Sequence, residues 1–287
     1  MIHYIDSATK EDFEVAKNNP TSINNYFYKY VPYKEMLNER SKDSLYFKRL
    51  ELWNDPWESF VLTGKYKIGK NDSAEYPLHK KVLATCFTGN YGSESQWHIY
   101  EQNESRIMLS YNKAKLIEVL EASVTHFYIG KVRYHIPQPL IKKAIEGWAI
   151  EHIDYFKKSY EGVHYESDDY KMLLEPLLIK RKPFAYEEEY RFFIIDETDK
   201  QTYNMPIPNL GTAIGKVTLS PNYPKDLSNG GIEGKENEKK LLASFQEKQK
   251  EELRKYGFNN ISSSSLRIEK NGTLFNLTKQ ILNAPKI

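Results

Sequence analysis

The β-strand that decides the predicted fold includes the sequence Pro183-Phe184-Ala185-Tyr186-Glu187-Glu188-Glu189-Tyr190-Arg191-Phe192-Phe193 and is predicted over residues 184–195. Side chains alternate between the two faces of a strand, so Glu187, Glu189 and Arg191 are expected on one face. Glu188 is expected on the other face, among aromatic residues. Buried charges are costly unless they are paired, so a row of three charges beside an apolar run indicates a functional site. An exposed face with a cross-strand salt bridge is the alternative.

The segments around this strand alternate between short strands and helices. Further strands are predicted at 26–31, 44–47, 81–88, 106–111, 126–134 and 214–219. Helices are predicted at 9–17, 33–40, 112–122, 139–159, 168–179 and 238–256, and a capping box of Ser93 and Gln96 opens another. Loops are predicted at 52–58 and 221–237, and a hairpin at 265–277 around Asn271-Gly272.

No repeat and no change in composition divides the 287 residues. We therefore expect a single α+β domain over residues 1–287, in which mainly antiparallel strands are flanked by helices. A C-terminal helix and hairpin at 236–280 is expected to complete it. The 22 Tyr residues suit strand faces and the walls of pockets, since each supplies apolar area with a polar tip.

Composition limits the partners of this chain. Its net charge of +2 gives no bulk support for binding to a membrane or to nucleic acid, although a local basic patch leaves nucleic acid open. The single Cys excludes an internal disulfide and a thiolate zinc site within the chain. No signal-peptide pattern and no apolar run of about 18 residues is found, so a cytoplasmic, bacterial protein is expected. The sequence does not set the oligomeric state.

Common catalytic and cofactor motifs are missing from the sequence. The seven His residues have no metal-binding spacing, so no metal site is expected. There is no phosphate loop, no dinucleotide-binding glycine pattern and no nucleophile elbow. Kinase, P-loop, Rossmann and serine-hydrolase functions are therefore not favoured.

Three further segments hold candidate binding residues. In the loop Trp53-Asn54-Asp55-Pro56-Trp57-Glu58, two Trp side chains could wall a ligand pocket or could anchor a turn. Trp97 and Tyr100 share one side of a predicted helix, which is most often a core-facing side. Lys180-Arg181-Lys182 could hold a phosphate or could form a solvated helix end.

Taken in order, these segments resemble a widespread bacterial domain-of-unknown-function family. The landmarks are Tyr28-Lys29-Tyr30, Leu45-Tyr46-Phe47, Trp53-Asn54-Asp55-Pro56-x-Glu58, Cys86-Phe87, Trp97-x-x-Tyr100 and Tyr186-Glu187-x-Glu189-x-Arg191. The resemblance covers about residues 26–220 and the C-terminal helix and hairpin. Trp53 stands where that family usually has Phe, Phe184 where it usually has Trp, and the residues after Trp97 also differ. The family resemblance implies no activity.

The order of the landmarks is also similar, at the level of the fold, to that of ADP-ribosyltransferases. Those enzymes hold NAD between two early strands and a Glu on a later strand, and that Glu stabilises the oxocarbenium-like transition state. The similarity implies an NAD-using enzyme of a toxin or phage-defence type, with Glu189 as the catalytic carboxylate and Glu187 as its helper. It implies NAD or nucleotide contacts by Tyr28, Lys29, Tyr30, Tyr46 and Arg191. Asn54, Asp55, Trp97 and Tyr100, in the landmark segments, are further candidate binding residues. The His or Arg that those enzymes carry on the first strand is missing here.

Two other functions are compatible with the same residues. Asp55, Glu58, Glu187 and Glu189 could share Mg²⁺ in a nucleic-acid enzyme, if their segments converge. Alternatively, Glu187, Glu189 and Arg191 could form a structural ion-pair network in a non-catalytic binding module. An open pocket beside Glu189, and the residues that line it, would distinguish these hypotheses.

Overall fold

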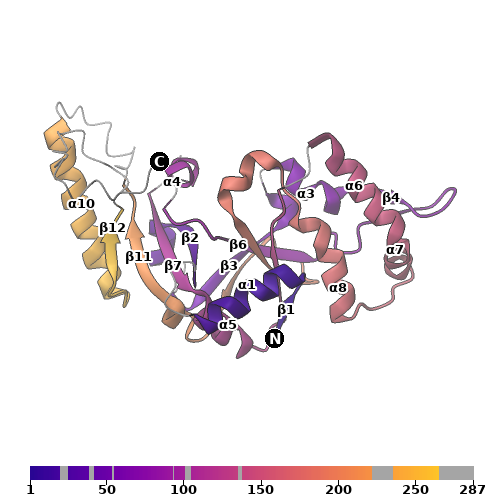
Figure 1. Cartoon of the computed structure of the whole chain (residues 1–287), viewed down its shortest axis with the longest axis horizontal. Coiled ribbons are helices and arrows are strands. Elements are labelled where there is room, and N and C mark those ends of the chain that lie inside the picture. Colours follow the sequence, from indigo (N-terminus) through magenta and orange to yellow (C-terminus); the bar gives the residue numbers. More distant parts are fainter. Residues whose placement is uncertain are drawn as a thin grey trace, which may run out of the picture.

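The computed structural model describes residues 1–19, 25–38, 42–53, 55–92, 94–100, 105–134, 138–221 and 235–264. These residues form one mixed, mostly antiparallel sheet with helices on its faces, which confirms the predicted α+β class (Figure 1). Its strands are β1 (Ile2–Tyr4), β2 (Tyr26–Pro32), β3 (Ser44–Arg49), β6 (Val82–Thr88), β7 (Arg106–Asn112), β8 (Phe127–Lys131), β9 (Glu189–Ile195), β10 (Thr202–Pro206), β11 (Ile214–Leu219) and β12 (Ile261–Ser263). A separate hairpin consists of β4 (Lys65–Lys67) and β5 (Ser73–Glu75).

The strands lie in the order β1-β8-β9-β6-β2-β7-β11-β12, and β3 joins β10 to β6. Only the pairs β1–β8 and β11–β12 are parallel among the described strand pairs. The helices are α1 (Ser7–Asn18), α2 (Tyr33–Asn38), α3 (Pro56–Thr63), α4 (Glu94–Tyr100), α5 (Lys113–Glu121), α6 (Gln138–Glu151), α7 (Ile153–Tyr160), α8 (Ser167–Leu174) and α10 (Lys235–Lys255). Short 3₁₀ turns are η2 (Leu50–Leu52), η3 (Glu175–Leu178), η4 (Lys182–Glu187) and η5 (Leu210–Ala213).

The two faces of the sheet have different cores. Phe27, Phe87 and Phe192 belong to the largest apolar cluster, together with side chains of α1, α5 and α10. The opposite face has two smaller clusters. One packs Phe193 and Ala84 under α3, α7 and α8, and the other surrounds Trp97 of α4. Figure 1 shows α10 at the β12 end of the sheet and α3, α6, α7 and α8 at the other end.

The predicted strand over 184–195 is wrong in its first half. Pro183 lies at the start of η4, where its fixed φ and missing N–H are tolerated. Glu188 then takes a left-handed conformation with φ of 42°, and β9 begins only at Glu189. The alternation that was expected to place Glu187 beside Glu189 therefore does not apply to Glu187, whose side chain enters from a turn.

Three other predictions are corrected by helix ends. The loop 52–58 is partly helical, because Asp55 caps α3 and Pro56 takes its first position. The helix predicted over 139–159 is broken at His152, between α6 and α7. Pro176 does not kink one long helix: α8 stops at Leu174, and the proline lies in η3.

The remaining elements agree with expectation more closely. Asn112 accepts a hydrogen bond from the N–H of Lys115 and caps α5 as predicted. The sequence missed β1, β4, β5, β10 and β12, which are short strands of 3 to 5 residues. The predicted hairpin at 265–277 and most of the loop at 221–237 lie outside the described residues. Within the described ranges, none of the helices has the length and apolar content needed to cross a membrane.

A tight contact below the site leads to a first prediction. Gly130 of β8 pairs with Arg191, and a Cβ added to Gly130 would lie 2.3 Å from Cδ1 of Leu178. We expect Gly130→Ala to lower the free energy of unfolding by about 1–3 kcal/mol, because the buried side chain of Leu178 must shift. Urea denaturation measures this change.

Gly147 of α6 provides the matched control, because a Cβ there would meet no atom within 4 Å. Gly147→Ala should raise stability by roughly 0.5–1 kcal/mol, since Ala favours the helix. Equal effects of the two substitutions would contradict the close packing of η3 on β8.

Candidate functional site

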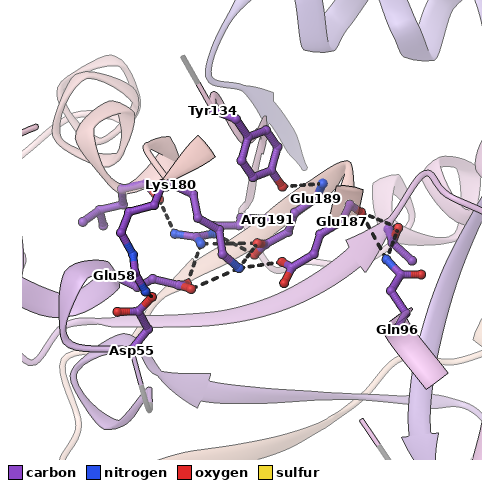
Figure 2. Close-up of polar contacts among 11 residues, drawn as sticks. Asp55, Glu58, Gln96, Tyr134, Lys180, Glu187, Glu189 and Arg191 are labelled. Atoms are coloured by element: carbon purple, nitrogen blue, oxygen red, sulfur yellow. Dashed lines mark hydrogen bonds and ion pairs between the residues drawn. The ribbon is translucent and has the colours of Figure 1, made fainter. Parts of the chain in front are cut away.

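Five charged side chains meet on the second face of the sheet, and we call them the ion-pair network: Glu58, Lys180, Glu187, Glu189 and Arg191 (Figure 2). Arg191 is 0% exposed and Glu189 is 4% exposed, so these two charges are almost fully shielded from water. Such charges are tolerated only when they are paired and hydrogen-bonded. The charges of the network are paired in this way, which is the condition for burying a row of charges such as Glu187, Glu189 and Arg191 beside the core.

The ammonium group of Lys180 occupies the centre of three carboxylates. Its Nζ lies 3.0 Å from Oε1 of Glu58, 2.6 Å from Oε2 of Glu187 and 2.9 Å from Oε2 of Glu189. These carboxylates hold the pKa of Lys180 above its ordinary value, although burial alone would lower it. Lys180 is thus a permanent cation in this site.

The guanidinium of Arg191 ties the network to the backbone. Its Nε donates to Oε1 of Glu189 at 2.8 Å and its Nη2 donates to Oε2 of Glu58 at 2.6 Å. Its Nη1 donates to the carbonyl of Leu177 at 2.6 Å, and its Cζ lies 4.8 Å from the ring centre of Trp53. Planar guanidinium groups suit such multiple contacts, which fix their orientation.

Local structure explains why distant residues converge. Asp55 caps α3 and turns Glu58, in the first turn of the helix, toward the sheet. Asp55 also forms an ion pair with Arg181, the residue after Lys180. The N–H of Lys180 donates to the carbonyl of Arg133, beside β8. The α3 cap and the segment after η3 are therefore held together next to β9.

The site shifts the pKa values of Glu187 and Glu189 in opposite directions. Burial alone would raise the pKa of Glu189, but Arg191 and Lys180 hold it well below its ordinary value of 4.5. Burial raises the pKa of Glu187 above 4.5, and Lys180 only partly opposes this. Pairs of groups separated in this way are typical of acid–base sites.

The two carboxylates also differ in how fully they are bonded. Both oxygens of Glu189 accept hydrogen bonds, from Arg191 and Lys180. In Glu187 only Oε2 does so, from Lys180, and Oε1 accepts no hydrogen bond from a described residue. Glu187 therefore keeps one open carboxylate oxygen.

A cavity of about 140 Å³ lies beside these two carboxylates. It is lined by Tyr28, Lys29, Tyr30, Cys86, Phe87, Thr88, Glu187 and Glu189. Sites for whole drug-sized ligands measure about 300–1,000 Å³, so this cavity suits one ring or one sugar. Its lining combines aromatic walls with a cation and two carboxylates.

The cavity lies where β2 and β3 diverge from each other along β6, and we call this place the fork. β2 pairs with β6 only at Tyr28–Thr88, and β3 pairs with the other end of β6. Between them Lys29 reaches across and donates to Oγ1 of Thr85 at 2.6 Å and to the carbonyl of Cys86 at 2.8 Å. Lys29 thus takes the place of a missing strand partner while its side chain lines the cavity.

The turn that carries Glu187 is held by polar side chains on β6 and α4. The hydroxyl of Thr88 donates to the carbonyl of Glu187, and Nε2 of Gln96 donates to the same hydroxyl at 3.0 Å (Figure 2). Nδ2 of Asn90 donates to the carbonyl of Tyr186 at 3.0 Å. These bonds fix the position of Glu187 relative to the cavity.

The thiol of Cys86 is not activated in this arrangement. Burial and the neighbouring Glu189 raise the pKa of its thiol well above its ordinary value, so the thiol is neutral at pH 7. Its role is to line the cavity beside Glu189.

The structure brings together six of the predicted site residues. Tyr28, Lys29, Tyr30, Glu187 and Glu189 line the cavity, and Arg191 lies directly behind it. Trp97 is not at the cavity wall: it is 1% exposed and packs edge-on against Tyr30, so its assignment as a contact residue is not supported.

The other predicted residues are placed differently. Tyr46 lies on β3 opposite Asn204 and does not line the cavity. Asp55 caps α3 and pairs with Arg181. Asn54 and the side chain of Tyr100 lie outside the described residues.

Sequence reasoning missed Lys180 as the centre of the network. In the sequence, Lys180 belongs to a basic cluster that predicts a phosphate contact or a solvated helix end, whereas in the structure its ammonium is buried among carboxylates. Thr88 and Cys86 were also missed as cavity residues. In the structure, Thr88 is opposite Glu189 and Cys86 is opposite Arg191. The pairing of β6 with β9 would therefore have been enough to predict that Thr88 and Cys86 lie beside the site.

The Mg²⁺ hypothesis required carboxylates to converge, and three of the four do. However, the ammonium of Lys180 lies between Glu58, Glu187 and Glu189, and the fourth, Asp55, turns to Arg181. Among the described residues, no group of three or more His, Cys, Asp or Glu side chains has the geometry of a metal site. The arrangement is that of a network built around a lysine.

Comparison with known proteins gives no family for this chain, because no family model, no curated protein and no solved structure matches it. Function must therefore be argued from the chemistry of the site.

Proposed function

We propose that this protein is an ADP-ribosyltransferase-like enzyme that cleaves the bond between nicotinamide and ribose in NAD. The observation that supports this most is the open Oε1 of Glu187 beside an aromatic-walled cavity. Glu189, which the sequence favoured as the catalytic carboxylate, is fully bonded to cations. In the proposed site, Glu187 takes the catalytic role and Glu189 positions the cations around it.

The proposed step needs one negative group near the anomeric carbon. The C1′–N bond breaks, its electron pair leaves with nicotinamide, and positive charge develops on the ribose ring. The carboxylate of Glu187 stabilises that charge in a site from which water is largely excluded. A nucleophile then attacks C1′, and Glu187, whose pKa is raised by burial, accepts its proton.

The size of the cavity sets which part of NAD enters. At about 140 Å³ it has room for the nicotinamide ring or the adjoining ribose, and the rest of the molecule would lie outside it. Tyr28 and Tyr30 offer rings for stacking on a flat aromatic group. The nucleophile could be water or a residue of a target protein, as a toxin or phage-defence role would require.

A non-catalytic binding module is the second candidate. It is favoured by the way in which Glu58, Glu189 and Arg191 satisfy one another, since such pairing can be purely structural. A binding module would also hold its ligand in the cavity. Both candidates therefore predict ligand binding, and only the enzyme predicts chemical turnover of the ligand.

The aromatic wall gives a prediction that tests ligand binding. We expect NAD to bind the wild type and Tyr28→Leu to weaken that binding about tenfold, because stacking on an aromatic side chain contributes roughly 1–3 kcal/mol per base. Leu keeps an apolar side chain at this buried position. Isothermal titration calorimetry with NAD measures both constants.

Tyr128→Leu is the matched control. Tyr128 is as buried as Tyr28 but belongs to the cluster under α3 and α8 and does not line the cavity. Its replacement should leave the affinity for NAD unchanged. Absence of heat on titration of the wild type with NAD would rule out the proposed function.

A further inference from the structure

A second and larger cavity lies away from the ion-pair network. It measures about 490 Å³, which is within the range of small-molecule sites. It opens between the end of α3, the β4 strand and the helices α6 and α7, which lie together in Figure 1. Its apolar lining includes Phe60, Tyr66, Ile68, Ile145, Ile150 and Phe156.

The walls of this cavity leave apolar surface open to water. Ile150 is 73% exposed although it belongs to the lining. The deeper wall is part of a buried cluster that contains Ile145 and Phe156. The cavity is therefore an apolar slot with an open mouth, in which burial of a hydrocarbon chain is favourable.

The charged residues of the lining are mostly basic. Lys65, Lys67 and Lys142 line the cavity, and Glu146 is the one acid among the described lining residues. Glu146 lies 3.8 Å from Lys142, so that pair is neutral together. Lys65 and Lys67 form no ion pair with a described residue, which leaves two positive charges at the slot.

Apart from Glu146, no described acid lines the cavity. Glu75 is opposite Lys65 in the β4–β5 hairpin, but its carboxylate lies 4.0 Å from His79 and does not line the cavity. Lys65 and Lys67 flank Tyr66 and so project from the side of β4 opposite to the Tyr66 ring, and both line the cavity at its mouth. An apolar slot with two cations on one rim is complementary to an anionic amphiphile.

We propose that this cavity binds a single-chain amphiphile with an anionic head, of the fatty-acid class. The hydrocarbon chain lies between Phe60, Ile145 and Phe156, and the carboxylate lies at Lys65 and Lys67. This site is separate from the proposed NAD site and does not depend on it.

Calorimetric titration of the full chain with dodecanoate, below its micellar concentration, tests the site. We expect saturable binding at one site. The double variant Lys65→Glu, Lys67→Glu should weaken dodecanoate binding about tenfold, because two attractive charges become repulsive. The same variant should bind neutral dodecanol as the wild type does.

Two further variants separate the site from general effects. Lys10→Glu, Lys248→Glu makes the same change in net charge at exposed positions on α1 and α10 and should leave binding unchanged. Ala149→Phe fills the slot and should abolish binding, and Ile150→Asp, at an exposed position, should weaken it if Ala149→Phe disturbs folding. Absence of dodecanoate binding, or binding unaffected by all slot variants, would overturn the proposal.

Discussion

Arg191→Met should lower the free energy of unfolding by about 3–5 kcal/mol, which is the usual effect of removing one partner from a buried ion pair. The guanidinium is fully buried and contacts Glu58, Glu189 and the carbonyl of Leu177. Met retains much of the apolar stem but leaves both carboxylates facing a cavity without their partner. Urea denaturation at pH 7 measures the loss.

Arg133→Met is the matched control. Arg133 pairs with Glu175 at 2.9 Å, but its side chain is 44% exposed, so its replacement should change stability by less than about 1 kcal/mol. If Arg191→Met and Arg133→Met lowered the free energy of unfolding by the same amount, the description of the network as buried would be contradicted.

The same network gives a pH dependence with a defined sign. The pKa of Glu189 is lower in the folded protein than in the unfolded chain, because Arg191 and Lys180 stabilise its ionised form. Its contribution to stability is therefore complete above its unfolded pKa, near 4.5, and is lost as the pH falls below that value. In Arg191→Met the depression is smaller, so less stability is lost on acidification than in the wild type.

Glu187→Gln should reduce NAD cleavage about 10²- to 10³-fold, which is typical of removing one group that stabilises the transition state. The amide keeps the shape of the side chain and an oxygen for Lys180. It removes the negative charge and the ability to accept a proton. The rate of nicotinamide release, followed by chromatography, measures the loss.

Stability distinguishes a catalytic Glu187 from a structural one. Burial raises the pKa of Glu187, so its ionised form is disfavoured by the fold, and this penalty is present at pH 7. Lys180 keeps Glu58 and Glu189 as ion-pair partners in Glu187→Gln, so no buried cation is left unpaired. Glu187→Gln should therefore melt at or above the wild-type temperature while activity falls. Glu188→Gln, one residue away and exposed, should change neither property. A fall in melting temperature with Glu187→Gln would instead indicate a structural ion pair.

The sequence predicted part of the ion-pair network but not how it is built. Alternation placed Glu189 and Arg191 on one face of a strand, and β9 has both there, in register with Thr88 and Cys86. Glu187 was assigned to that strand by the same alternation. It reaches the site from a turn instead, because Pro183 favours η4 and Glu188 adopts a left-handed conformation.

The partners of the network could not be predicted because they are far away in the chain or lie in irregular structure. Glu58 and Arg191 are separated by 133 positions, and only the packing of α3 on the sheet brings them together. Lys180 follows η3, and a basic cluster in a sequence gives no indication that one of its members is buried. The fork between β2 and β3 that creates the cavity likewise depends on pairing across the sheet, which local patterns do not encode.

The proposed function is tested most directly by whether the wild-type protein releases nicotinamide from NAD. Purified full-length chain is incubated with NAD at pH 7, with and without a nucleophilic acceptor, and products are separated by chromatography beside Glu187→Gln and Glu188→Gln. We predict nicotinamide release by the wild type and by Glu188→Gln, and release reduced about 10²- to 10³-fold in Glu187→Gln. Equal release by the wild type and by Glu187→Gln, or no release by any of the three, would contradict a catalytic role for this site.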